Sequence, residues 1–200
     1  MGAPSKRLGF EGEAGDRKRT DRGLGRTVGA LLSLAIVITV VVLALQGGGG
    51  GDGTRVDTAP RLVDEGDLFS LAADLGHPVY WAGPRPPSQI ELTREAAGSV
   101  YLRYLPVAAE PGDPRPRFLT VGTYPVAEAQ ATLRRTAEGA GASLGHVPGG
   151  GVVLVDPSEP ASVYLAYPAS DLQIEVYNPA PGRAMRLIRS GAVQPLGLSR

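Results

Sequence analysis

The residues with the most obvious chemical potential lie in one short stretch of the chain. Gly141, Ser143 and Gly145 match the G-x-S-x-G pattern that presents a nucleophilic serine in many hydrolases, and His146 follows directly. In those enzymes a strand precedes the serine and a helix follows it. Here the hydrophobic pattern predicts the reverse order, a helix before the serine and a strand after it. Hydrolysis by Ser143 and His146 is therefore an alternative hypothesis rather than the favoured one.

The composition gives little support to other catalytic or metal-dependent chemistry. The chain has no cysteine and two histidines, which excludes disulfides, thiolate zinc sites, iron–sulfur clusters and cysteine nucleophiles. Both lysines, Lys6 and Lys18, lie near the N-terminus, so a phosphate-binding loop with its lysine is excluded. The acidic residues show no spacing typical of a general acid and base. We therefore predict no catalytic residues, no metal and no cofactor, and we expect a protein that is not an enzyme.

Two sets of residues could instead bind a partner. The first is Arg183, Arg186 and Arg189, which recur every three residues on a predicted helix, and guanidinium groups bind phosphate in a bidentate manner. The same stripe is also typical of a solvated helix face whose cations favour the C-terminal end of the helix dipole. The second set is Tyr101 and Tyr164, each on a predicted strand that carries another tyrosine. We expect one tyrosine of each strand in the core and the other exposed, where it can serve recognition, although a structural role is the favoured interpretation.

An uncharged, apolar stretch near the N-terminus predicts a membrane anchor. No residue between Arg26 and Asp52 is charged, and residues 27–45 would span about 28 Å as a helix. That length matches the roughly 30 Å hydrocarbon core of a bilayer. We assign residues 27–46 to a single transmembrane helix. The alternative is a secretory signal cleaved after Ala44, although the apolar run is longer than the usual ~7–15 residues.

Charge predicts the direction of this anchor. Residues 1–26 carry seven basic and four acidic side chains, whereas the opposite flank is a run of glycines. The positive-inside rule places residues 1–26 in the cytoplasm as a basic tail and exports the rest of the chain. Residues 47–66 are then a Gly-rich flexible linker, and residues 67–200 form an extracytoplasmic domain.

Small residues recur every four positions around the start of the predicted transmembrane helix, at Gly25, Gly29 and Ser33. That spacing lets two helix backbones approach closely in lipid. The expected partner is the lipid bilayer, through residues 27–46. A homodimer through Gly25, Gly29 and Ser33 is a second hypothesis, and the alternative is that these small residues are incidental in a Gly-rich chain.

Beyond the linker, the hydrophobic pattern predicts an α+β domain. Alternating apolar residues, ended by Gly- and Pro-rich turns, predict strands over about 77–83, 90–93, 99–105, 118–124, 152–155, 162–167 and 172–177. Helical spacing predicts helices over about 67–75, 125–138 and 180–190. Asp67 is the expected N-cap of the first helix, and Gly76 its end. These elements predict an antiparallel sheet of six or seven strands with the helices packed on one face.

The order of the elements indicates an internal duplication. Three segments recur in the same order: 75–77 (LGH) as 144–146, 99–104 (SVYLRY) as 162–167 (SVYLAY), and Tyr124-Pro125 as Tyr177-Asn178-Pro179. We predict two pseudo-repeats, about 67–139 and 126–192, related by a pseudo-two-fold axis. His77 and His146 would then both lie directly after a helix, where an imidazole can meet the free carbonyls as a structural group.

Charge and composition disfavour nucleic-acid binding and indicate a bacterial origin. The 20 basic residues balance the 20 acidic ones, so the chain lacks the overall positive field that attracts nucleic acid. Eighteen of the basic residues are arginine, a bias typical of high-G+C bacterial genes.

We expect a single-pass protein of the bacterial cell membrane whose extracytoplasmic domain binds an envelope protein or an anionic polymer. The alternatives are an envelope hydrolase using Ser143 and His146, and a single-pass sensor with a short cytoplasmic tail. The sequence leaves open whether one edge of the sheet is free for strand addition.

Overall fold

A computed structural model describes residues 57–140, 142–157 and 159–197. The predicted cytoplasmic tail, the transmembrane helix and Gly25, Gly29 and Ser33 lie outside the described residues, together with about half of the linker. No helix within the described ranges is long and apolar enough to cross a membrane. The fold described below is that of the predicted extracytoplasmic domain together with residues 57–66. These residues belong to the predicted flexible linker, but they contain a strand, Arg61–Val63, and the start of a helix at Glu65.

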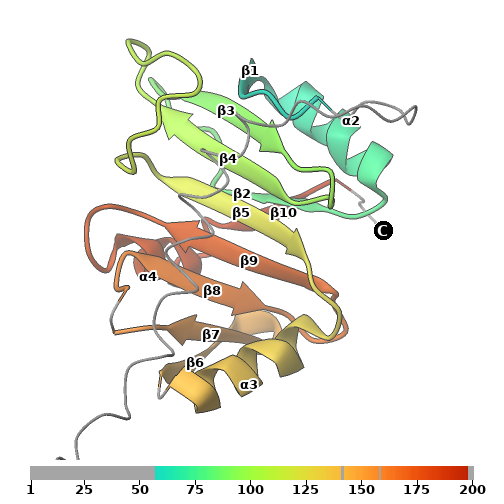
Figure 1. Cartoon of the computed structure of the whole chain (residues 1–200), viewed down its shortest axis with the longest axis vertical. Coiled ribbons are helices and arrows are strands. Elements are labelled where there is room, and N and C mark those ends of the chain that lie inside the picture. The colour runs from blue at the N-terminus through green and yellow to red at the C-terminus, as the bar shows by residue number, and fades with distance from the viewer. Residues whose placement is uncertain (1–56, 141, 158, 198–200) are drawn as a thin grey trace, which may run out of the picture.

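One antiparallel sheet of eight strands forms the centre of the domain (Figure 1). Its strands, in spatial order, are β1 (Arg61–Val63), β3 (Gln89–Arg94), β4 (Val100–Leu105), β5 (Thr120–Pro125), β9 (Leu172–Tyr177), β8 (Ser162–Ala166), β7 (Gly151–Val155) and β6 (Ser143–Val147). A second sheet pairs β2 (Val79–Trp81) with β10 (Gln194–Leu196). The α+β class and the antiparallel sheet are confirmed, but six or seven strands are too few. The strands that were not predicted, β1, β6 and β10, are short or lie at an edge, where apolar alternation is weak.

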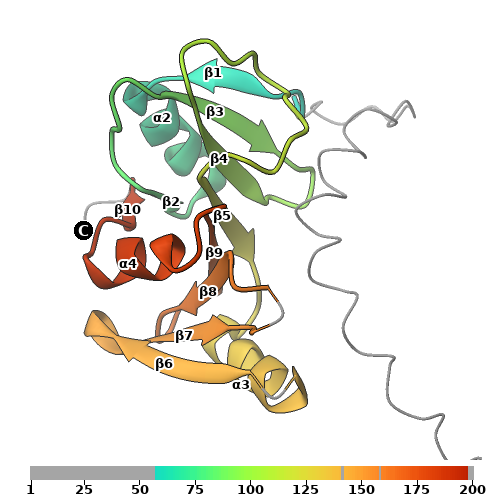
Figure 2. The same cartoon turned by 90° about the vertical axis from the view of Figure 1, so that its left-hand side faces the viewer.

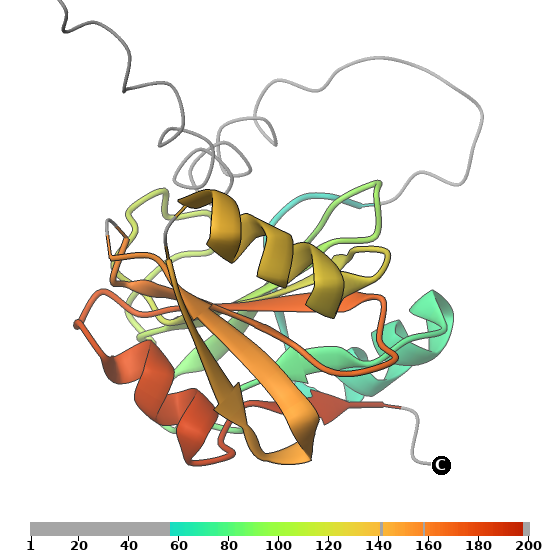
Figure 3. The same cartoon turned by 90° about the horizontal axis from the view of Figure 1, so that it is seen from below.

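The described residues form three helices, α2 (Glu65–Leu75), α3 (Ala129–Ala140) and α4 (Arg183–Arg189). α2, α4 and the β2–β10 pair cover one face of the eight-stranded sheet, which we call the first face. α3 covers the other, second face (Figure 2, Figure 3). The prediction that the helices pack on one face is therefore wrong.

Helices pack on both faces of the sheet because the strands near its β6 end carry apolar side chains on both sides. In β7, Val153 packs with the core of the first face and Val152 with the core under α3. β8 shows the same alternation at Leu165 and Ala166. Since successive side chains of a strand point to opposite faces, each set is buried by a different helix.

α2 begins three residues earlier than predicted. Asp64 is its N-cap, and the Asp64 side chain accepts a hydrogen bond from the Asp67 amide. The Asp67 side chain in turn accepts one from the Asp64 amide, so the two residues form a capping box. Gly76 ends the helix in the left-handed conformation, as predicted, because glycine adopts it without steric cost.

The two halves of the sheet share one pairing register. Tyr101 of β4 pairs with Gly122 of β5, and Tyr164 of β8 pairs with Glu175 of β9. Gly122 and Glu175 also pair with each other, where β5 meets β9. A local two-fold axis perpendicular to the sheet therefore passes between Gly122 and Glu175. The predicted duplication requires this register. The helices do not follow the same symmetry, because α3 and α4 lie on opposite faces of the sheet, so the duplication itself stays a prediction.

Candidate functional site

Ser143 and His146, the residues of the hydrolase hypothesis, both lie on β6. They are three residues apart, so the alternation of a strand directs their side chains to opposite faces. Neither side chain makes a hydrogen bond to another described residue. Ser143 is in a strand and not at a strand-to-helix turn, so it lacks the geometry of a nucleophile elbow.

The two histidines occupy different structural places. His77 follows the end of α2, as predicted, and its Nδ1 lies 3.0 Å from the carbonyl oxygen of Pro78. The expected position of His146 at a helix end is wrong, because α3 ends at Ala140 and His146 lies inside β6. In the part of the chain that the structure describes, no three His, Asp or Glu side chains gather as a metal site would require.

Tyr101 and Tyr164, predicted to contact a partner, project from the second face. Tyr101 is 5 % exposed, and Tyr104 of the same strand is equally buried on the first face. The expectation that one tyrosine of each strand is exposed is wrong for β4, because both faces of this strand are covered. Tyr164 is half-buried. Tyr101 packs edge-on against Tyr124, with ring centroids 5.5 Å apart, so its ring contributes to the interior.

Glu175 lies among these tyrosines and is 3 % exposed. The Tyr124 hydroxyl donates a hydrogen bond to one carboxyl oxygen at 2.6 Å, and the Ser162 hydroxyl donates to the other at 2.7 Å. Burial raises the pKa of Glu175 above its ordinary value, and the two hydrogen bonds oppose that rise. Burial, followed by the charge of Glu175, also raises the pKa of Tyr124 well above 10.0. The network links the neighbouring strands β5, β8 and β9.

A buried ion pair fastens the loop of residues 106–117 over the second face. Glu91 is fully buried, and one of its oxygens lies 2.8 Å from Nη1 of Arg103. Its other oxygen accepts a hydrogen bond from the Gly112 amide, and Arg103 donates to the carbonyl of Asp113. The sequence did not indicate this site, because Glu91 and Arg103 lie on different strands and resemble solvent-exposed charges.

The outer side of β6 is an open edge of the sheet. No other described strand pairs with it. Ser143, Leu144 and His146 are exposed, and Leu144 keeps 37 % of its surface accessible. The strand contains neither charge nor proline, which commonly protect an edge from pairing with other chains. The turn over Pro148–Gly150, which joins β6 to β7, is the sequence signal for this hairpin.

The predicted arginine stripe lies on the solvent-facing side of α4. Arg183, Arg186 and Arg189 are all exposed, whereas Ala184 and Ile188 are buried against the first face. None of the three arginines forms an ion pair with another residue of the described ranges. The structure thus places three unpaired guanidinium groups on one surface, and their role in anion binding stays a prediction.

The edge of β6 and the arginine stripe of α4 are accessible to a partner. The outer edge of β1 is also unpaired among the described strands, but β1 has three residues and carries the charge of Arg61, two features that protect an edge from strand addition. The buried tyrosines and the ion pair under the loop belong to the interior. Comparison with protein-family models, with curated proteins and with solved structures finds no match for this chain.

Proposed function

We propose that this protein is a membrane-anchored interaction domain of the cell envelope that binds an extended segment of a partner protein along β6. The observation that carries the proposal is the outer edge of β6, which no strand of the described chain covers. In this proposal residues 27–46 are the anchor and the residues between 47 and the start of β1 at Arg61 are the spacer. The domain then faces the outside of the membrane, where envelope proteins are within reach.

An open sheet edge binds a peptide through the main chain. Alternate residues of an edge strand direct N–H and C=O groups outward, and an added strand pairs with them. The side chains add specificity, because Leu144 and His146 project from the second face, on which α3 packs. An apolar side chain of the partner can lie against Leu144, beside the core under α3.

The test is site-specific cross-linking of the full-length protein in its own membrane. A photoreactive amino acid replaces Leu144, and in the control it replaces Phe69, an exposed apolar residue of α2. We expect a discrete adduct with one envelope protein from position 144 and none from position 69. Equal, diffuse labelling from the two positions contradicts the proposal. An adduct between two copies of the chain also contradicts it and indicates a homodimer.

A charge at the edge tests strand addition directly. Lys on an edge strand opposes pairing with another strand, so Leu144→Lys should abolish an adduct formed from a photoreactive residue at position 146. Phe69→Lys makes the same chemical change on α2 and should leave that adduct unchanged. Survival of the adduct in Leu144→Lys means that the partner contacts position 146 without using the edge.

The arginine stripe supports a second candidate, binding of an anionic polymer. Polyphosphate is the probe, and the triple variant Arg183→Gln, Arg186→Gln, Arg189→Gln is compared with Arg117→Gln, Arg134→Gln, Arg135→Gln. Both variants remove three positive charges, but only the first removes a contiguous row. We expect affinity for polyphosphate to fall at least about tenfold in the first variant alone. Equal losses would mean that net charge, and not this surface, determines binding.

The envelope-hydrolase and sensor hypotheses stay untested. The hydrolase hypothesis requires that Ser143→Ala and His146→Ala abolish an activity. Strand addition should survive both substitutions, because it uses the main chain of β6, which neither substitution changes. The sensor hypothesis depends on residues 1–46, which lie outside the described ranges.

A further inference from the structure

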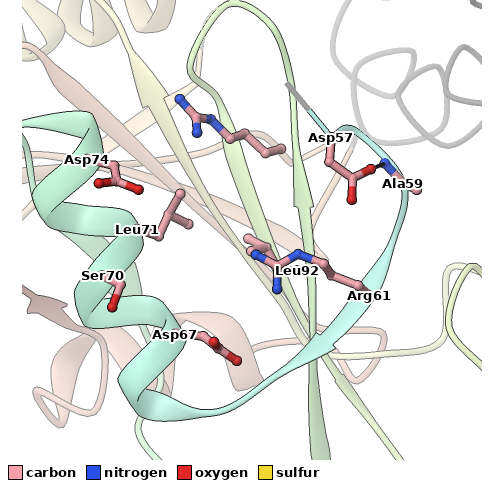
Figure 4. Close-up of a pocket in the computed structure, with 9 residues that line it drawn as sticks. Asp57, Ala59, Arg61, Asp67, Ser70, Leu71, Asp74 and Leu92 are labelled. Carbon is pink, nitrogen blue, oxygen red and sulfur yellow. Dashed lines mark hydrogen bonds between the residues drawn. The ribbon is translucent and has the colours of Figure 1, made fainter. Parts of the chain in front are cut away.

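A small cleft lies between α2 and the edge of the sheet formed by β1 and β3 (Figure 4). Its volume is about 210 Å³. Leu71 of α2 and Leu92 of β3 give it an apolar floor, and charged side chains surround that floor. The cleft and β6 lie at opposite ends of the eight-stranded sheet, so it is separate from the proposed partner-binding edge.

Two guanidinium groups line the cleft from the sheet. Arg61 pairs with Leu92, and Arg94 is two residues further along β3, so both arginines project to the face on which α2 packs. They are diagonal cross-strand neighbours, a relation that separates residues by about 7–8 Å. Neither forms an ion pair or a hydrogen bond with another described residue, and Nε of Arg94 is buried without a partner. That spacing separates the residues on the two strands, and their long side chains can bring both guanidinium groups to one anionic group.

Two carboxylates line the same cleft from the helix. Asp67 and Asp74 are seven residues apart, which places them on one side of α2, about 10 Å apart along the helix axis. Asp67 already accepts one hydrogen bond in the capping box, whereas Asp74 makes none to the described residues. Within the same ranges, no ion pair joins these carboxylates to Arg61 or Arg94. The charges of α2 therefore face those of the sheet across open space. A third carboxylate, Asp57, lines the cleft beside Ala59, whose amide donates a hydrogen bond to it.

We propose that this cleft binds a small zwitterion, a molecule with one carboxylate and one ammonium group, such as a free amino acid. Arg61 and Arg94 bind the carboxylate, and Asp74 binds the ammonium group. The apolar floor contacts a short side chain of the ligand. The volume is below the ~300–1,000 Å³ of pockets for drug-sized ligands, so the ligand has about the size of an amino acid.

Three probes separate a zwitterion from a simple ion. Alanine carries both charges, N-acetylalanine carries only the negative one, and alaninamide carries only the positive one. Saturation-transfer NMR on the full-length protein in lipid nanodiscs measures their affinities. We expect alanine to bind at least about tenfold more tightly than the other two, because each of them leaves one charged side of the cleft without a partner. Equal binding of N-acetylalanine makes the cleft an anion site, and equal binding of alaninamide makes it a cation site. Either result overturns the proposal, as does the absence of binding.

Two substitutions test the two sides of the cleft separately. Arg61→Gln and Asp74→Asn change exposed residues, so we expect both variants to fold, and circular dichroism checks this. Each should weaken alanine binding about tenfold or more, because each removes an ionic hydrogen bond. Arg134→Gln and Glu138→Gln make the same chemical changes on α3 and should leave the affinity unchanged. Unchanged affinity in either folded cleft variant overturns the proposal.

Discussion

Gly122 and Glu175 face each other across the central β5–β9 pair, and the missing side chain of Gly122 makes room for the hydrogen bond of Glu175. A Cβ atom at position 122 would lie 2.7 Å from the hydroxyl oxygen of Tyr124. The Tyr124 ring therefore covers Gly122, and its hydroxyl reaches Glu175. Glycine in a strand often marks such a close approach. The hydrogen bond between Tyr124 and Glu175, at the centre of the sheet, therefore depends on the absence of a side chain at Gly122.

Gly122→Ala should destabilise the protein by about 1–3 kcal/mol, because the added methyl group displaces the rigid Tyr124 ring. The control is Gly139→Ala in α3, where no atom lies within 4 Å of the added methyl group. We expect this control to stabilise the protein by up to about 1 kcal/mol, since alanine favours helix more than glycine does. Urea unfolding measures both free energies. Equal effects of the two substitutions would show that Tyr124 adjusts without cost.

The raised pKa of Glu175 predicts a pH dependence of stability. The folded state holds this proton more tightly than the unfolded chain, so the contribution is complete below the ordinary value of 4.5 and is lost as the pH rises through the raised pKa. Glu175→Gln cannot titrate. We therefore expect the unfolding free energy of the native protein, relative to Glu175→Gln, to fall as the pH rises above 4.5. A difference that stays constant or rises with pH contradicts the raised pKa.

The hydrogen-bond network around Glu175 shows which features of the interior can be predicted from the sequence. Strand alternation predicted the strands that carry Tyr101, Tyr164 and Glu175, because apolar residues at every second position mark one buried face. It did not predict that the opposite face is buried too, since Glu91 and Glu175 are of a type usually found in solvent. Their partners come from other strands, which only the folded chain brings together.

The accessible surfaces were also predicted only in part, because some of them depend on contacts between distant segments of the chain. The spacing of the arginines on the last helix predicted that they share one side, because local periodicity determines that relation. The edge position of β6 depends on how the whole sheet is ordered, and Leu144-Gly145 instead resembled a helix end. The cleft between α2 and β1 requires two segments to pack against each other, which no local pattern reveals.

Arg103→Met leaves the buried carboxylate of Glu91 without its counter-charge. Loss of one partner of a buried ion pair costs about 3–5 kcal/mol. The loop of residues 106–117 also loses its hydrogen bond to Arg103, so it should be cleaved faster by protease. Arg134→Met, at an exposed position of α3, should change the stability by less than about 0.5 kcal/mol. Urea unfolding and limited proteolysis measure these effects; similar results for the two variants would mean that the buried pair contributes little.

The predicted topology can be tested with single thiols, because the chain has no cysteine. Ser190→Cys lies at the exposed end of α4, and Ser5→Cys lies in the predicted cytoplasmic tail. A maleimide that cannot cross membranes should label Ser190→Cys in intact spheroplasts and Ser5→Cys only after permeabilisation, because the bilayer separates the two positions. Labelling of Ser190→Cys only after permeabilisation contradicts export of the domain. Recovery of the labelled domain from the medium, without Ser5, would mean that the apolar segment is a cleaved signal and not an anchor.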